Sequence, residues 1–205
     1  MELSTFLYFL IASVLLTLAP GPDIMYLLAK SLADGARSGI SLATGLCTGL
    51  IFHTTLVIIG VAAIIQQSPL AFAALKYAGA AYLLYLAWGA FHAQGDLKLN
   101  TVNKSNSYFK LYRRGVIMNI LNPKVLLFFL AFLPQFVNLD SDSVSLQIAF
   151  LGFVFGLQTL IVFSLVAICA GKVRDYILNI KNFNKIMGYV QGIVLIGISL
   201  ALIIS

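Results

Sequence analysis

The chain is poor in charged residues, which make up 10% of its 205 residues, while hydrophobic residues make up 60%. Soluble domains average about 25% charged and about 45 to 50% apolar residues. The mean hydropathy is +0.98. These proportions exclude a soluble globular protein. They indicate an all-α integral membrane protein, since a helix satisfies its own backbone hydrogen bonds in lipid.

Cysteine and phosphate-binding motifs are also scarce. Cys47 and Cys169 each lie in an apolar run, without the spacing of a disulfide or zinc site. Gly171 and Lys172 lack the upstream glycine and the following Ser or Thr of a phosphate-binding loop. No nucleophile and base stand together as in an enzyme. We therefore expect no metal, no cofactor, no catalysis and no ATP-driven pumping by this chain alone.

Six apolar runs are long enough to cross a bilayer, which takes roughly 17 to 25 residues. They lie at about 3–19, 39–65, 70–91, 115–137, 145–171 and 186–204. The sequence therefore predicts one membrane domain, residues 1–205, with six transmembrane helices in contact with the lipid bilayer. We expect the first run to be a mature helix rather than a secretory signal, because Met1-Glu2 has no basic region and no cleavage pattern precedes Pro20.

The chain holds 13 Lys and Arg residues against 7 Asp and Glu residues, and most of the basic ones lie in alternate connections. The first, third and fifth connections are basic, above all the third at about 92–114, whereas the second and fourth are neutral or acidic. Lys and Arg excess marks cytoplasmic loops. This distribution predicts that both termini face outward and argues against nucleic acid as a partner. A basic loop that binds anionic lipid is the alternative.

Three features recur in the same order in both halves of the chain. They are a proline (Pro22, Pro123), a Gly-x-x-x-Gly pair (Gly45 and Gly49, Gly152 and Gly156) and a Lys-x-x-Gly pair (Lys76 and Gly79, Lys185 and Gly188), at offsets of 101, 107 and 109 residues. We infer two three-helix repeats, at about 1–95 and about 104–205. An odd number of helices inverts the second repeat, as in many secondary transporters. We interpret the glycine pairs as helix-packing faces. Chance similarity is the alternative.

Prolines with polar neighbours interrupt the first and fourth segments. The breaks comprise Pro20, Gly21 and Pro22 in one half and Pro123 in the other. A straight helix over 3–34 would be about 48 Å long, well beyond the ~30 Å hydrocarbon core. We therefore expect two helical pieces, 3–19 and 24–33, with a re-entrant arrangement as the alternative. Backbone groups freed by proline persist only where they face protein or a water-filled cavity, so the breaks predict a binding site.

Two opposite charges follow the breaks at repeat-equivalent positions, Asp23 after Pro22 and Lys124 after Pro123. A carboxylate in the first turn is favoured by the helix dipole, whereas a cation opposes it. An ionisable group at membrane depth also costs several kcal/mol. Lys124 therefore needs an anion, either Asp23 or a substrate carboxylate. The alternatives are that Lys124 snorkels to the interface and that Asp23 is only a structural cap.

Three amides and a histidine are further candidates. Asn119 and Asn122 share a helical face before Pro123, where they could bind the freed carbonyls or contact substrate. Gln158 could line the cavity or join two helices. His53 could relay protons or be a hydrogen-bonded core residue. Our candidates for substrate binding or coupling are Asp23, Lys124, Asn119, Asn122 and Gln158.

Several motifs resemble the LysE/RhtB family of amino-acid exporters. They are the Pro-Gly-Pro-Asp of residues 20–23, the stretch 31–39, the Asn-Pro-Lys motif within 115–124, and the Leu-Pro-Gln-Phe of 133–136. The resemblance implies export of amino acids or related small metabolites across the bacterial inner (plasma) membrane, driven by the proton or an ion gradient. Members often carry Asn where this chain has Asp23. Because the candidate cavity residues are mostly neutral and apolar, we expect neutral or hydrophobic substrates.

The mechanism we expect is alternating access, with the two repeats moving about the broken helices. The free backbone amides at the start of the half-helix that begins at Pro22 would bind the substrate carboxylate. Asp23 would receive the substrate ammonium or a coupling proton. A gated small-solute channel and a membrane assembly subunit without transport are the alternatives. A homo-oligomer is compatible with the sequence.

Overall fold

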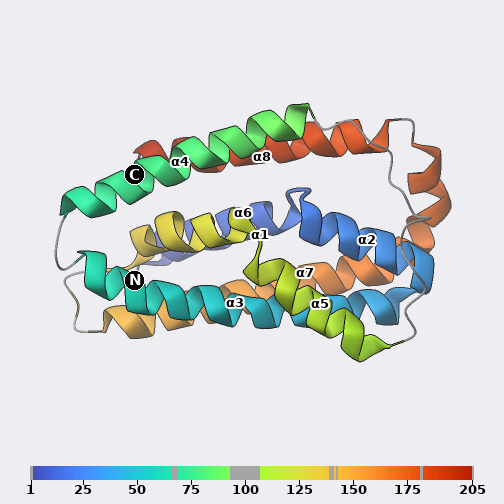
Figure 1. The fold of residues 1–205 in the computed structure, drawn as a ribbon, viewed down its shortest axis with the longest axis horizontal. Coiled ribbons are helices and arrows are strands. Elements are labelled where there is room, and N and C mark those ends of the chain that lie inside the picture. Colours follow the sequence, from blue (N-terminus) through green and yellow to red (C-terminus); the bar gives the residue numbers. More distant parts are fainter. Residues whose placement is uncertain are drawn as a thin grey trace.

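The computed structural model describes residues 2–65, 69–92, 107–138, 141, 143–180 and 182–204. Every regular element within these ranges is helical (Figure 1). The α-helices are α1 (Leu3–Leu18), α2 (Pro22–Asp34), α3 (Ala36–Ile65), α4 (Pro69–Phe91), α5 (Tyr108–Ile120), α6 (Pro123–Leu127), α7 (Val144–Asn179) and α8 (Phe183–Ile204). After α6 the chain continues as a π-helical turn, Phe128–Phe132, and a 3-10 turn, Leu133–Phe136.

Four of these helices, α3, α4, α7 and α8, are long and apolar enough to cross a membrane. The other two spans are bent pairs. The axes of α1 and α2 meet at 57°, and the axis of α5 meets that of 123–136 at 50°. The breaks at the prolines are therefore confirmed. The described residues are consistent with the predicted six spans when each bent pair is counted as one span, and a re-entrant arrangement of a bent pair is still the alternative.

The second half repeats the order of the first, and each of its elements runs in the opposite direction to its counterpart (Figure 1). Thus α7 runs opposite to α3, α8 opposite to α4, and α5 with α6 opposite to α1 with α2. Both termini lie at the same end of the bundle (Figure 1). This is the inverted arrangement that the recurring motifs predict. The boundary between the repeats and most of the basic connection fall in 93–106, outside the described residues.

Aromatic side chains fill the core where α1, α7 and the second bent segment meet. The ring of Phe128 lies 4.8 Å from that of Phe132 and 5.3 Å from that of Phe155, and Phe9 lies 5.3 Å from Phe136. The π-helical turn that carries Phe128 and Phe132 follows α6, the short helix that begins at the proline break. Such turns are frequent at functional sites. Here the turn anchors the segment after the break in the core.

Glycines bring α3 and α5 into backbone contact. A Cβ on Gly45 would lie 2.0 Å from the Tyr112 carbonyl oxygen, and a Cβ on Gly115 would lie 2.4 Å from that of Leu42. Because no side chain fits there, these residues allow the two helix axes to approach closely. Gly49 faces Asn119 of α5 in the same way.

The second glycine pair lies on α7, and its two glycines differ in how closely α3 approaches them. A Cβ on Gly152 would meet the Thr54 hydroxyl oxygen at 2.4 Å, so this glycine stands at a close contact with α3. A Cβ on Gly156 would be 3.9 Å from Leu50, which is ordinary van der Waals contact. Both glycines border an open groove between α3 and α7.

Candidate functional site

The first break is closed by a lysine from the other half of the chain. The carbonyl of Leu16 would normally accept from the amide of residue 20, but Pro20 has no N–H. The ammonium of Lys124 donates to this oxygen at 3.0 Å and to the Ala19 carbonyl at 2.9 Å. Lys124 therefore caps the C-terminal end of α1, where the helix dipole favours a cation.

This placement differs from two of the arrangements expected for Lys124, an ion pair with Asp23 and snorkelling to the interface. Its ammonium binds carbonyl oxygens of α1 instead of the Asp23 carboxylate, although both side chains line the same cavity. Lys124 is 6% exposed and so does not reach out of the protein. A salt bridge is found instead within α2, where it joins Lys30 to Asp34.

The second break is closed by a histidine from α3. Pro123 leaves the carbonyl of Asn119 without its usual amide partner, and His53 Nε2 lies 2.9 Å from this oxygen. A carbonyl can only accept, so Nε2 is the donor. The oxygen also accepts from the Asn122 amide at 2.9 Å. His53 is fully buried and hydrogen-bonded, as the core alternative predicts.

The side chains of the two asparagines do not bind the freed carbonyls, which was one of the two roles expected for them. The Asn122 side-chain oxygen accepts from the Lys124 amide at 3.0 Å and caps the start of α6. The Asn119 amide points to the Asp23 carboxylate, with 3.5 Å between the donor and acceptor atoms. The freed carbonyls are bound by His53 and Lys124 instead. Asn119 thus links the second break to the charged residue of the first.

Asp23 is a buried carboxylate with unused hydrogen-bonding capacity. It lies in the first turn of α2 and is 5% exposed. Its Oδ1 has no hydrogen-bond partner among the described residues, and neither do Asn119 Oδ1, Asn122 Nδ2 and His53 Nδ1. An unsatisfied buried polar atom costs about 1 to 3 kcal/mol. The concentration of such atoms at the two breaks is typical of a place that binds another polar species.

Gln158 joins α7 to α1 through hydroxyl groups. Its amide donates to Thr17 at 2.9 Å and to Thr159 at 2.8 Å, and the two hydroxyls lie 3.3 Å apart. Thr17 and Thr159 also line the cavity beside Asp23. Sequence reasoning missed both threonines, because a hydroxyl in an apolar helix usually bonds its own backbone. The amide thus links helices and supports the cavity wall.

The cavity at the breaks is small. It measures about 20 Å³ and is lined by the polar side chains of Thr17, Asp23, Asn119, Lys124 and Thr159 together with apolar residues of α1, α2, α3, α6 and α7. This volume holds one water molecule, far less than the roughly 300 Å³ or more of a ligand pocket. The structure is therefore closed around the charged groups, and a molecule larger than water would enter only after the helices separate.

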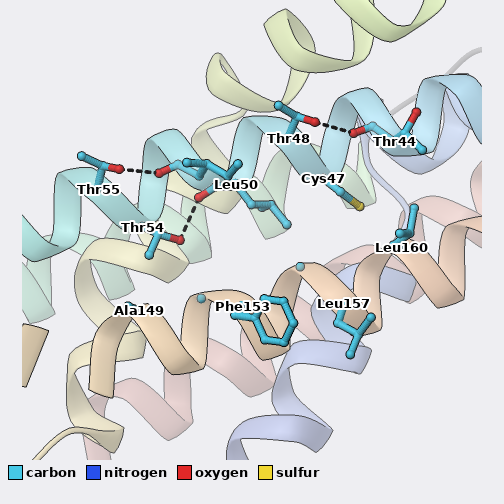
Figure 2. Close-up of a pocket in the computed structure, with 13 residues that line it drawn as sticks. Thr44, Cys47, Thr48, Leu50, Thr54, Thr55, Ala149, Phe153, Leu157 and Leu160 are labelled. Carbon is cyan, nitrogen blue, oxygen red and sulfur yellow. Dashed lines mark hydrogen bonds between the residues drawn. The ribbon is translucent and has the colours of Figure 1, made fainter. Parts of the chain in front are cut away.

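A larger hollow lies between α3 and α7 (Figure 2). It measures about 500 Å³, and Leu50 lines both this groove and the small cavity. The hydroxyls of Thr48, Thr54 and Thr55 on its wall donate to carbonyls of their own helix. Ile51 and Phe153 at its rim are exposed. The groove presents an apolar surface without charge, so the charged cavity is the candidate site.

Proline-broken spans that meet at a buried charged site in an all-helical membrane protein are the architecture of small-molecule transporters. A family model described as LysE type translocator matches residues 14–205. The chain therefore belongs to the LysE type translocator family.

Proteins that resemble it are membrane and efflux proteins. The uncharacterized membrane protein YrhP of Bacillus subtilis is 31% identical over 194 residues, which cover 90% of this chain and 91% of the relative. A homoserine/homoserine lactone efflux protein of Salmonella typhimurium is 32% identical over 183 residues, which cover 88% of each. No solved structure matches the chain.

Replacing His53 by Phe should lower the free energy of unfolding by about 1 to 2 kcal/mol, because the Asn119 carbonyl loses a buried donor but keeps the Asn122 amide. Thermal unfolding in detergent measures this. His92→Phe is the control, because His92 is exposed, its ring nitrogen contacts the Trp88 carbonyl one turn earlier, and a Phe ring can keep its ring contact with Trp88. Equal losses in both variants would contradict the capping role of His53.

Proposed function

We propose that the protein is a secondary active exporter of amino acids or related small metabolites with neutral side chains, driven by the proton or an ion gradient. The observation that carries this proposal is Asp23, a carboxylate 5% exposed at a membrane-depth helix break, with an oxygen that has no partner among the described residues. Intramembrane ionisable residues are costly and mark substrate or ion pathways. The family and the efflux relative support the direction of transport.

The name of that relative also bears on substrate chemistry. Homoserine and its lactone both carry an α-ammonium group, but the lactone has no free carboxylate. A carrier of both compounds must recognise the ammonium in each of them. In this chain the buried acceptors at the break, above all Asp23, are suited to that group. The free amides at the start of α2 would bind the carboxylate when the substrate has one.

Alternating access requires that the closed cavity opens to one side at a time. The two bent spans are the natural moving parts, because their backbone ladders are already interrupted at residues 19–21 and 121–122. By contrast, α3 and α5 are held together by backbone contact at Gly45. We propose that α3 and α5 move as one body relative to α1 and α2.

The charge distribution orients the protein in this proposal. The helix ends next to the first, third and fifth connections lie at the end of the bundle opposite the termini (Figure 1). Arg37, Lys110, Arg113 and Arg114 are near that end, which we assign to the cytoplasm of a bacterium. Lys98 and Lys104 of the same basic connection lie outside the described residues. Both termini then face the outside of the inner membrane.

Counterflow in proteoliposomes tests the function. We expect vesicles preloaded with homoserine to take up labelled homoserine and homoserine lactone at least roughly tenfold faster than protein-free vesicles, whereas lysine should not exchange. Ion conductance without counterflow would favour a gated channel instead. The absence of flux for homoserine, for its lactone and for every other amino acid tested would contradict the proposal and favour an assembly subunit.

A further inference from the structure

We propose that the carbonyl oxygens of Leu16 and Ala19, together with Asp23, form a subsite for a primary ammonium group, and that Lys124 occupies this subsite as a tethered surrogate when no substrate is bound. The identity of the ligand as an amino acid rests on the proposed function. The subsite itself rests on the contacts of Lys124 and on the cavity it shares with Asp23.

The acceptors of the subsite are created by the first break. Pro20 leaves the Leu16 carbonyl without an amide partner, and Ala19 follows the last residue of α1. Both oxygens lie at the negative end of the α1 dipole. They surround one nitrogen at 3.0 and 2.9 Å. Carbonyls at an interrupted membrane helix bind cations in this way in transporters.

The present occupant has the same chemistry as the proposed ligand. A lysine ammonium, like the α-ammonium of an amino acid, offers three N–H donors and no acceptor. The Lys124 ammonium donates hydrogen bonds to the carbonyls of Leu16 and Ala19 at the end of α1. The residue itself lies in the first turn of α6, where its own helix dipole disfavours a cation. Its position is therefore held by the carbonyls of α1, which another ammonium can bind equally well.

The space around the ammonium allows one occupant at a time. The cavity measures about 20 Å³, so a substrate ammonium can reach these carbonyls only by displacing Lys124. Gly21 keeps the approach clear, because a Cβ there would lie 3.2 Å from the Lys124 nitrogen. Asp23 and Asn119 are 5% and 2% exposed, and each has a side-chain oxygen without a hydrogen-bond partner in the described part of the chain; these oxygens are further acceptors near the ammonium.

The exchange has a physical advantage for a transporter. The freed carbonyls never lose their donor, because one ammonium replaces the other, and so no unsatisfied buried group opposes substrate release. The number of buried charges at the carbonyls also stays the same. An anion or an uncharged solute cannot displace Lys124, so the surrogate makes the site selective for compounds with a primary ammonium.

Chemical rescue tests the subsite. Lys124→Ala removes the equivalent of propylammonium from the site, so we expect added propylammonium to raise the Tm of this variant by roughly 3 to 6 °C near saturation. The wild-type protein should respond far less, because its tethered Lys124 competes for the subsite at a high effective concentration. Lys110→Ala is the matched control, since Lys110 is exposed on α5. Tetramethylammonium, which has no N–H donor, and 1-propanol, which has no charge, should have no effect.

Two further variants keep the test decisive. Lys124→Met keeps an unbranched apolar side chain that fills the space of the lysine stem. If Lys124→Ala does not fold, a Tm shift is therefore expected in Lys124→Met with the ammonium ion, which supplies only the missing nitrogen and its N–H donors. Adding Gly21→Ala to either variant should reduce the response, because the new methyl group crowds the subsite. An equal response in wild type and Lys110→Ala, an equal effect of tetramethylammonium, or no response in any Lys124 variant would overturn the proposal.

The same measurements separate this inference from the proposed function. If wild-type vesicles show counterflow but neither propylammonium nor the ammonium ion rescues the Lys124 variants, the protein is an exporter without this subsite. If rescue occurs but wild-type vesicles show no counterflow of any amino acid, the ammonium subsite stands and the exporter function fails.

Discussion

Asp23→Asn is expected to lower homoserine export by about 30-fold or more, because hydrogen bonds to a charged group contribute about 1.5 to 3 kcal/mol and a neutral amide supplies no charge for an ammonium or a proton. The substitution keeps the size of the side chain and its contact with Asn119. The fold should therefore survive. Initial rates of efflux from proteoliposomes, with and without a pH gradient, measure the effect.

The control for this variant is Glu2→Gln, which removes a carboxylate from an exposed position before α1 and should leave export unchanged. Asp23→Glu keeps the charge, so it should retain more activity than Asp23→Asn. Export by Asp23→Asn at the wild-type rate and with the wild-type dependence on the pH gradient would exclude a coupling role. Asp23 would then be the structural cap that its position in the first turn also permits.

Gly45→Ala is expected to cost about 3 kcal/mol of folding free energy, because the new Cβ would lie 2.0 Å from a backbone oxygen of α5. A backbone oxygen cannot move aside as a flexible side chain can. The helices would have to separate, and α5 carries the second break. Thermal unfolding and the yield of monodisperse protein in detergent measure the effect.

Gly197→Ala on α8 is the matched control, since a Cβ there has nothing within 4 Å. This substitution should be neutral or stabilising, because alanine favours the helix by up to about 1 kcal/mol over glycine. If the two variants lost equal stability, the backbone contact between α3 and α5 would not be the reason for glycine at position 45.

The bounds of the spans could be predicted from the sequence to within a few residues where contact with lipid alone sets the hydropathy pattern. The apolar runs at 39–65 and 70–91 correspond to α3, Ala36–Ile65, and α4, Pro69–Phe91. The run at 115–137 did not reveal that its helix begins earlier, at Tyr108. That first part is basic and aromatic, and it is held by contacts with α3, such as the hydrogen bond from Ser41 to the Tyr108 carbonyl at 2.6 Å. Hydropathy does not detect such contacts.

The members of the site could be named from the sequence, but not their partners. Asp23, Lys124 and Asn119 were candidates because polar groups beside a proline in an apolar run are costly. The expected partner of Lys124 was the Asp23 carboxylate, and in the structure its ammonium binds the carbonyls of Leu16 and Ala19. Whether a proline frees a carbonyl depends only on the local sequence. Which distant donor reaches that carbonyl depends on how the helices pack.

By itself, the amino-acid sequence determined that the protein lies in lipid, where its spans run and where two of them break. These properties depend on hydrophobicity and on the missing N–H of proline, which act at each residue wherever it is placed. Only the tertiary structure decided that Lys124 closes the first break, that His53 closes the second, and that Thr17 and Thr159 face Asp23. The contacts of His53 with Asn119, of Lys124 with Ala19 and of Thr17 with Thr159 join residues 66, 105 and 142 positions apart, and helix packing alone sets which of them meet.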